Sequence, residues 1–237
     1  MLKAMVIFSG GLDSTTCLYW ALDRFDEVHT LTFDYNQRHS IEVEYAEKTI
    51  RLAEQIKNKR IKRHRFFIDL AQIGASALTD RSIEVPKGRS MEEIGSGIPI
   101  TYVPFRNGIF LSITAAVCEV NGIEHIIGGW NVLDYSGYPD CRKPFLNACE
   151  EAMNHGTKLG SEGGRFHILT PLISLKKSEI IMLGKKHGAD YSYSYSCYEG
   201  KEIPCGKCDA CILRAKAFQE AGLKDDFLVR LRNEGVR

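Results

Sequence analysis

The sequence contains no long hydrophobic run: no apolar stretch approaches the roughly 20 residues that a membrane-spanning helix needs. The residues from Met1 to Ala4 lead directly into an apolar segment, so we expect no signal peptide. Neither sign of charge dominates, because 31 basic and 30 acidic side chains leave a net charge of +1. These absences argue against a membrane or nucleic-acid partner and predict a cytoplasmic protein.

Short apolar runs alternate with amphipathic stretches, and no internal repeat or low-complexity segment interrupts them. The sequence predicts strands at residues 4–8, 28–33, 64–68, 125–129 and 166–169. It predicts helices at residues 15–22, 41–56, 106–120, from 143 onward, 174–186, 209–221 and 225–233. This order favours an α/β fold with a doubly wound, parallel five-stranded sheet in a single domain, residues 1–237, which includes a C-terminal helical region at about 190–237.

Two loops interrupt the predicted pattern. Residues 69–104 are rich in glycine and proline and carry no clear periodicity, so we expect a functional lid or a partly mobile loop. Residues 156–164 form a second glycine-rich segment.

The chain is organised around a glycine-rich turn between the first predicted strand and the first helix. Its residues are Ser-Gly-Gly-Leu-Asp-Ser, from Ser9 to Ser14. Glycines let the backbone approach a ligand closely, and the free N–H groups of a helix start attract anions, so the turn suits phosphate. Asp13 fits beside phosphate if Mg²⁺ bridges the two. The Walker A and Rossmann patterns are both absent, and the alternative is an ordinary turn capped by Ser14.

Half of the eight cysteines are clustered. Cys17, Cys118, Cys141 and Cys149 are scattered, whereas Cys197, Cys205, Cys208 and Cys211 follow the pattern Cys-x7-Cys-x2-Cys-x2-Cys. Four thiolates complete the tetrahedral shell of a structural Zn²⁺ and leave no open position. An iron–sulfur cluster is the competing interpretation, although the ferredoxin continuation is missing.

Further candidates lie at the predicted strand ends and helix starts. Arg38 follows the second strand, where open α/β sheets bind ligands. Arg106 opens a predicted buried helix, so it either forms a structural ion pair or faces phosphate. Lys176 or Lys177 could reach the outer phosphates of a nucleotide, although a solvated lysine is the ordinary interpretation of either.

A polar segment after the fourth strand contains Asp140 and Arg142. An aspartate can accept two N–H donors from a guanine-like edge, and an arginine can bind a carboxylate bidentately. The alternative is a polar loop with a surface ion pair that contributes little.

The segment at residues 8–18 resembles the pyrophosphate loop of the N-type ATP pyrophosphatases, whose fold is adenine nucleotide alpha hydrolase-like. Further segments at 35–39, 106–112, 136–142, 170–172 and 196–211 follow in order over nearly the whole chain. Together they resemble the 7-cyano-7-deazaguanine synthases of queuosine biosynthesis. Tyr-Pro-Asp-Cys-Arg and the cysteine cluster make the resemblance specific.

The resemblance implies an ATP-dependent carbon–nitrogen ligase that converts 7-carboxy-7-deazaguanine and ammonia to the nitrile through adenylated intermediates. It also implies a homodimer, with ATP, Mg²⁺ and one Zn²⁺ per subunit. We then expect Asp13, Lys177 and Arg106 to be catalytic and Tyr138, Asp140 and Arg142 to contact the substrate. The expected ATP-binding residues are Phe8, Ser9, Gly10, Gly11, Leu12, Asp13, Ser14, Thr15, Thr16, Cys17, Leu18 and Arg38.

Two other functions stay open at this point. One is another ATP pyrophosphatase, such as a tRNA-thiolating or amidating ligase, although the chain has neither an added RNA-binding domain nor a basic face. The other is a nucleotide-sensing module without catalysis, in which the cysteine cluster contacts a partner.

Overall fold

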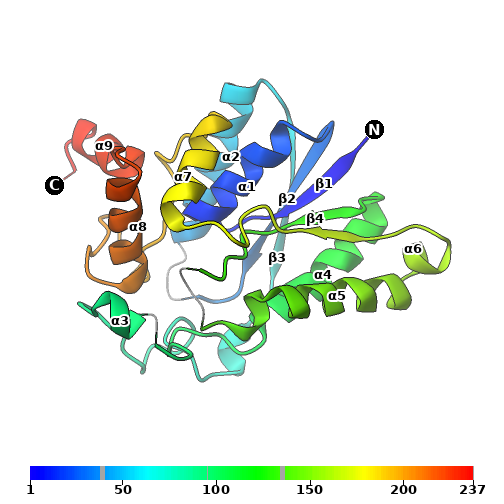
Figure 1. Cartoon of the computed structure of the whole chain (residues 1–237), viewed down its shortest axis with the longest axis horizontal. Helices are drawn as coiled ribbons and strands as arrows, with labels where there is room; N and C mark the ends of the chain where they lie inside the picture. The colour runs from blue at the N-terminus through cyan, green and yellow to red at the C-terminus, as the bar shows by residue number, and fades with distance from the viewer. Residues whose placement is uncertain (38–40, 95, 134–136, 237) are drawn as a thin grey trace.

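The computed structural model describes residues 1–37, 41–94, 96–133 and 137–236 (Figure 1). Its centre is a five-stranded sheet with the strand order β3-β2-β1-β4-β5. The strands are β1 (Lys3–Ile7), β2 (Glu27–Asp34), β3 (Ile61–Phe67), β4 (His125–Ile127) and β5 (His167–Leu169). All neighbouring strands are parallel, which confirms the predicted sheet. The strand order reverses beside β1, and ligands bind beyond the carboxyl ends of strands at such a point.

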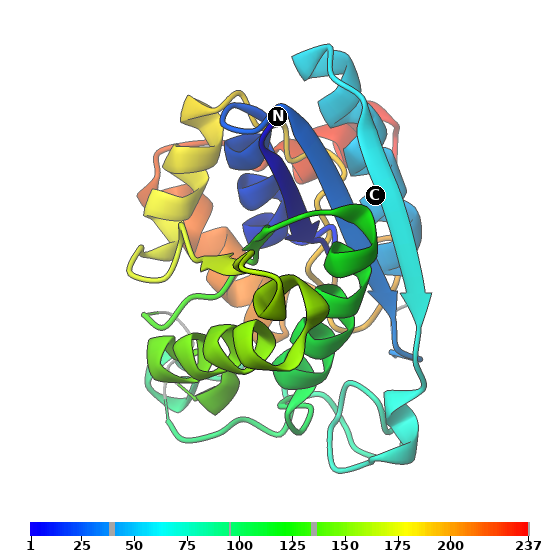
Figure 2. The same cartoon turned by 90° about the vertical axis from the view of Figure 1, so that its right-hand side faces the viewer.

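Helices cover both faces of the sheet, as Figures 1 and 2 show. One face carries α1 (Leu12–Leu22), α2 (Ile41–Lys57) and α7 (Lys177–Lys186), and the other carries α4 (Arg106–Asn121) and α5 (Lys143–Gly156). Side chains alternate along a strand, so Ala4 and Val6 pack with the first group, whereas Met5 packs with the second. Both faces therefore contain a hydrophobic core.

Several element boundaries differ from the predicted ones. The strand β3 begins at Ile61 rather than His64, because its basic first residues sit on an edge strand and still pair with Val28 to Thr30 of β2. The helix α7 begins at Lys177 rather than residue 174. The two predicted loops contain short helices, namely η1 (Leu70–Gln72), α3 (Met91–Ile94) and α6 (Lys158–Ser161).

The C-terminal region consists of α8 (Asp209–Glu220) and α9 (Asp226–Asn233), which follow the cysteine cluster. Arg214 of α8 binds both carboxylate oxygens of Asp225, at 2.6 and 2.7 Å, and both side chains are nearly buried. This bidentate pair fixes the start of α9 against α8. Within the described residues, no helix is both long enough and apolar enough to cross a membrane.

The turn after β1 depends on a close approach between two backbones. Gly10 has a φ of +78°, and a Cβ added there would lie 2.8 Å from the Cα of Ala46 in α2. The glycine therefore satisfies two constraints, a left-handed backbone and the absence of a side chain.

We expect Gly10→Ala to lower the free energy of unfolding by about 3 kcal/mol, because it adds a steric clash to backbone strain. Gly74→Ala is the matched control, since Gly74 has a φ of +73° and nothing within 4 Å of an added Cβ. It should cost only about 1 kcal/mol. Urea unfolding measures both, and equal losses would show that the approach to Ala46 is unimportant.

Candidate functional site

A pocket of about 320 Å³ lies at the carboxyl ends of β1, β2 and β4. The turn after β1 and the start of α1 line it, together with residues 128–131, which follow β4. The starts of α4 and α7 reach it from the two faces of the sheet, and residues between 195 and 214 complete the wall. This is the position that the strand order favours for a ligand.

The turn from Ser9 to Ser14 presents hydroxyl and N–H donors to this pocket. Ser9 Oγ lies 3.1 Å from Ser14 Oγ and accepts a hydrogen bond from the Gly11 N–H at 3.3 Å. The helix α1 starts after Gly11 without a side-chain cap, so its first N–H groups have no acceptor within the helix. Such a helix start is suited to bind an anion.

Asp13 and Lys177 form the charged centre of the pocket. Lys177 Nζ donates to Asp13 Oδ2 at 2.6 Å, and the other oxygen, Oδ1, is buried without a hydrogen-bond partner. A buried carboxylate oxygen without a partner is costly, so this atom is suited to a ligand such as a cation or a bound N–H group. The oxygen donor and its place beside the anion-binding turn fit Mg²⁺.

The contact between α7 and α1 positions Lys177. Tyr191 places its hydroxyl 2.7 Å from Thr16 Oγ1 of α1, in the buried space between the two helices. Gly184 of α7 makes this possible, because a Cβ there would lie 1.8 Å from the Tyr191 hydroxyl oxygen. The close packing brings the first residue of α7 next to Asp13.

Arg106 lies on the other side of the pocket, at the start of α4. Its guanidinium donates to Tyr35 Oη at 3.3 Å and lies 5.7 and 6.0 Å from the ring centres of Tyr35 and Phe110. Phe105, just before it, adopts a left-handed backbone with φ at +54°, and Gly108 leaves room for the Phe105 ring. Among the described residues no carboxylate forms an ion pair with Arg106, so the structure does not support the ion-pair alternative.

Tyrosines near Arg106 stay protonated at neutral pH. Burial raises the pKa of Tyr35 and that of Tyr138, although the nearby guanidinium of Arg106 acts in the opposite direction. Burial also raises the pKa of Cys141 to about 12, which keeps this pocket thiol neutral. Among the described residues, this side of the pocket therefore offers the cation of Arg106, neutral hydrogen-bonding groups and, near Tyr35, the carboxylate of Glu42.

The segment that the sequence assigns to ATP extends beyond the part that reaches the pocket. Phe8, Ser9, Gly11, Leu12, Asp13 and Ser14 line the pocket. Thr15, Thr16, Cys17 and Leu18 do not line it, because all four are completely buried along α1. The pocket-lining residues and Gly10, which lies between two of them, therefore remain the candidates for nucleotide contact. Arg38 lies outside the described residues.

The expected substrate contacts separate in the structure. Tyr138 lines the pocket, and its hydroxyl lies 3.0 Å from Thr101 Oγ1. Asp140 is buried and accepts the Asn107 N–H at 3.0 Å, so its carboxylate stabilises the start of α4. Arg142 is exposed before α5, and neither Asp140 nor Arg142 lines the pocket. In this structure neither side chain reaches the pocket, and contact of these two residues with the substrate stays a prediction.

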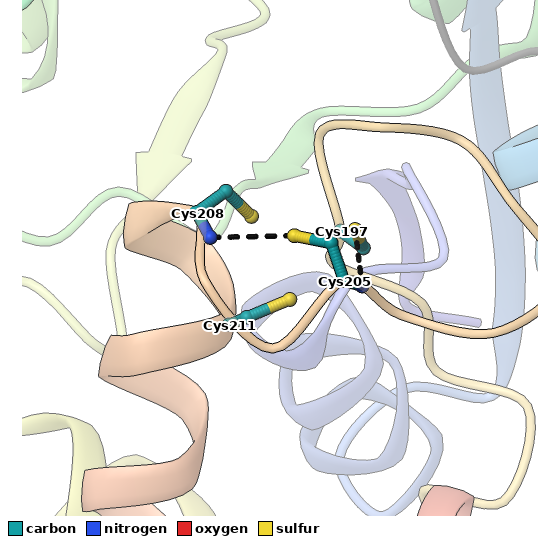
Figure 3. A group of neighbouring side chains, drawn as sticks. All are labelled: Cys197, Cys205, Cys208 and Cys211. Atoms are coloured by element: carbon teal, nitrogen blue, oxygen red, sulfur yellow. Dashed lines mark hydrogen bonds between the residues drawn. The ribbon is translucent and has the colours of Figure 1, made fainter. Parts of the chain in front are cut away.

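The four clustered cysteines converge, as Figure 3 shows. The Sγ atoms of Cys197, Cys205, Cys208 and Cys211 all lie within 4.8 Å of one another. Four sulfurs around Zn²⁺ at 2.3 Å would be about 3.8 Å apart, so a small contraction gives a tetrahedral shell. The N–H of Cys205 donates to Cys197 Sγ and that of Cys208 to Cys205 Sγ, both at 3.3 Å.

The charges of the cluster also favour a metal ion. Hydrogen bonds from Cys208 and Cys211 lower the pKa of Cys197, whereas the hydrogen bond with Cys197 raises the pKa of Cys208 to about 12 and raises that of Cys211 as well. When thiols lie this close together, only one of them loses its proton, because further thiolates would repel it. A cation between the sulfur atoms removes this limit. A divalent metal removes this repulsion and lets all four act as thiolates.

The segment before the cysteines connects this cluster to the pocket. The Tyr195 N–H donates to the Gly10 carbonyl at 2.9 Å, and Arg214 Nη1 donates to the Ser194 carbonyl at 2.9 Å. Tyr195, Ser196 and Arg214 all line the pocket. Ser196 opens the segment 196–211 that carries the family resemblance, whereas sequence patterns gave no signal for Tyr195 and Arg214, which reach the pocket only when the chain folds back on the turn after β1.

Comparisons with known proteins agree over nearly the whole chain. The family model described as queuosine biosynthesis protein QueC matches residues 3–222. A 7-cyano-7-deazaguanine synthase of Nostoc punctiforme is 46% identical over 224 residues, which cover 94% of this chain and 98% of the relative. One of Thermoplasma acidophilum is 49% identical over 223 residues, which cover 94% and 90%.

A solved structure is similar in fold alone. It is a 4-thiouridine synthetase–RNA complex with bound ATP, with a TM-score of 0.51 and 22% sequence identity. The match covers 99% of this chain and 53% of that chain, so the present chain spans about half the length of the synthetase.

Removal of the metal should loosen the wall of the pocket. We expect the protein to carry about one zinc ion per chain, and we expect a chelator or Cys208→Ser to weaken nucleotide binding roughly tenfold, the equivalent of one lost hydrogen bond. Elemental analysis and calorimetric titration measure the two effects. Cys149→Ser, a partly buried cysteine outside the cluster, should change neither. If the metal-free protein binds nucleotide with unchanged affinity, the cysteine cluster does not support the wall of the pocket.

Proposed function

Because the chain belongs to the queuosine biosynthesis protein QueC family, we propose that it is a 7-cyano-7-deazaguanine synthase. In this proposal it is an ATP-dependent carbon–nitrogen ligase, and it converts 7-carboxy-7-deazaguanine, ammonia and ATP to the 7-nitrile. The observation that carries the proposal is the Asp13–Lys177 pair beside the anion-binding turn, with one Asp13 oxygen left for a ligand.

The first half of the reaction activates the acid. A carboxylate oxygen of the substrate attacks the α-phosphorus of ATP, the bond to the β-phosphate oxygen breaks, and pyrophosphate leaves with that electron pair. Ammonia then attacks the carbonyl carbon and loses a proton, and AMP leaves with the bond to its oxygen. The product of this half is the neutral 7-amide.

The second half repeats the activation on the amide. The amide oxygen attacks the α-phosphorus of a second ATP, and pyrophosphate leaves again. The nitrogen loses its two protons and forms the triple bond to carbon, while AMP leaves with the former amide oxygen. In the proposal one ATP site serves both halves, because the two activations are the same phosphoryl chemistry.

Few proton-transfer groups are needed, so positioning and charge neutralisation supply most of the rate enhancement. Ser9, Gly10, Gly11 and Ser14 bind the phosphates through hydroxyl and backbone N–H groups. Lys177 neutralises charge that develops on the leaving pyrophosphate. Asp13 would hold Mg²⁺, which when bound neutralises the phosphate oxygens.

The cysteine cluster has a structural role in this proposal. With four sulfur ligands, a zinc ion has no open position for chemistry, so the metal would hold the segment that carries Tyr195 against the Gly10 carbonyl. We also propose that residues 1–237 act as one domain in the cytoplasm.

A homodimer is the remaining part of the proposal. The helix α4 exposes Val120, which is 86% accessible, although the sequence predicts α4 to be buried nearly all round. A single exposed valine is ordinary on a protein surface, so the proposed homodimer follows from the resemblance to the family. Analytical ultracentrifugation measures the oligomeric state directly.

The purified protein should convert the acid, ammonium and ATP to a product with the mass of the nitrile, with release of AMP and pyrophosphate. Lys177→Gln should lower kcat by roughly 10²- to 10³-fold, because it removes a charge that stabilises the transition state. The matched control is Lys176→Gln, at the exposed neighbouring position, which should retain kcat within about threefold. Nucleotide binding without turnover by the unmodified protein would instead favour a sensor.

A further inference from the structure

Arg106 has surroundings unlike those of a phosphate-binding cation. It reaches the pocket from α4, whereas Lys177 reaches it from α7, on the opposite face of the sheet (Figure 1). Its guanidinium donates to Tyr35 Oη at 3.3 Å, and among the described residues no carboxylate pairs with it. Among the described residues, Lys177 and Arg106 thus place cations at two separate ends of the pocket, and the turn from Ser9 to Ser14 belongs to the end with Lys177. Arg214 also lines the pocket, but it is paired with Asp225.

Aromatic rings surround this second cationic end. The Tyr35 ring packs edge-on against Phe110 at 5.6 Å, and Phe110 stacks on Phe33 with ring centres 3.9 Å apart. Tyr138 also lines the pocket, and the pKa of its hydroxyl responds to both Arg106 and Tyr35. Aromatic walls beside a guanidinium are suited to a flat, aromatic, anionic ligand.

The hydrogen-bonding capacity of this end matches a carboxylate. Tyr35 Oη accepts from Arg106, so its own proton is left to donate to an acceptor. A guanidinium carries several N–H donors in one plane, which matches the plane of a carboxylate. The nearby carboxylate of Asp140 accepts the Asn107 N–H and lies close enough to raise the pKa of Arg106, but within the described part of the chain no carboxylate forms an ion pair with this arginine.

We propose that Arg106, assisted by the Tyr35 hydroxyl, binds the carboxylate of the substrate and makes this end of the pocket specific for the acid. This inference rests on the proposed function and assigns Arg106 to the substrate acid rather than to ATP. One carboxylate oxygen is held by Arg106 and Tyr35, and the other stays available to attack the α-phosphorus.

The charge of the substrate differs between the two halves of the reaction. The acid carries a negative charge, and the 7-amide carries none. The charge of Arg106 therefore favours binding of the acid over binding of the amide, whereas a phosphate ligand would serve both halves equally, since each half consumes one ATP.

The test compares the two halves in the full-length, metal-loaded protein. Arg106→Gln should raise KM for 7-carboxy-7-deazaguanine roughly 10- to 100-fold, which corresponds to the loss of a charge-assisted hydrogen bond. With synthetic 7-amido-7-deazaguanine and ATP as substrates, KM should change by less than about threefold. Calorimetric titration should find ATP affinity unchanged within about twofold.

Two further variants keep the test informative if Arg106→Gln folds poorly. Arg106→Lys retains the charge and should recover part of the acid affinity, and Tyr35→Phe removes one oxygen and should weaken acid binding roughly threefold. Arg165→Gln is the matched control, because Arg165 is exposed just before β5. It lies at the amino end of that strand, whereas the pocket lies at the carboxyl ends of the strands. This control should alter no parameter.

Each outcome decides between the assignments. Selective loss of acid binding supports the proposal. Equal losses with acid and amide, together with weaker ATP binding, would overturn it and make Arg106 a phosphate ligand. If the unmodified protein converts neither acid nor amide, the proposed function itself fails, and the role of Arg106 fails with it.

Discussion

The hydrogen bond between Thr16 of α1 and the Tyr191 hydroxyl, 2.7 Å long and completely buried, fixes how α7 lies on α1. Gly184 is the residue that gives it space, since any side chain there would occupy the position of the tyrosine oxygen. Because α7 begins at Lys177, this packing decides which lysine reaches Asp13. The charged centre of the pocket therefore depends on an interaction that takes no part in the chemistry.

The doubly wound sheet supplies the pocket from two sides. One side provides the turn from Ser9 to Ser14 and Lys177 of α7, and α4 on the other face of the sheet provides Arg106. The reversal of strand order beside β1 separates the two groups of helices, which opens the space between them. Such an arrangement suits two reactants that must meet while each is recognised separately.

The cysteine cluster closes this space from a third direction. Its sulfur atoms lie close enough for one metal ion, and the chain before Cys197 returns to the Gly10 carbonyl through Tyr195. Arg214 ties the same segment to α9 through Asp225. A cluster of four cysteines that lies outside the charged centre of the pocket thus still helps to determine the shape of the pocket.

Local patterns of the sequence were enough to predict most strands and helices, the glycine-rich turn and the cysteine cluster, because each depends on residues close together in the chain. The alternation of these strands and helices then predicted the parallel sheet. A strand, two glycines and a helix start define the turn, and the x2 spacing places Cys205, Cys208 and Cys211 within reach of one ion. The start of the edge strand β3 was harder to predict, because basic residues interrupt the apolar pattern in its first half.

Only the tertiary structure could select among side chains that sequence alone leaves equivalent. The packing of α7 places Lys177 rather than Lys176 next to Asp13. The carboxylate of Asp140 contacts the start of α4 instead of the pocket. The tertiary structure also brought Tyr35 to Arg106, which is 71 residues away in the chain. The reason is physical: spacing along the chain determines local backbone geometry, whereas the direction in which a side chain faces depends on distant segments that occupy the remaining space.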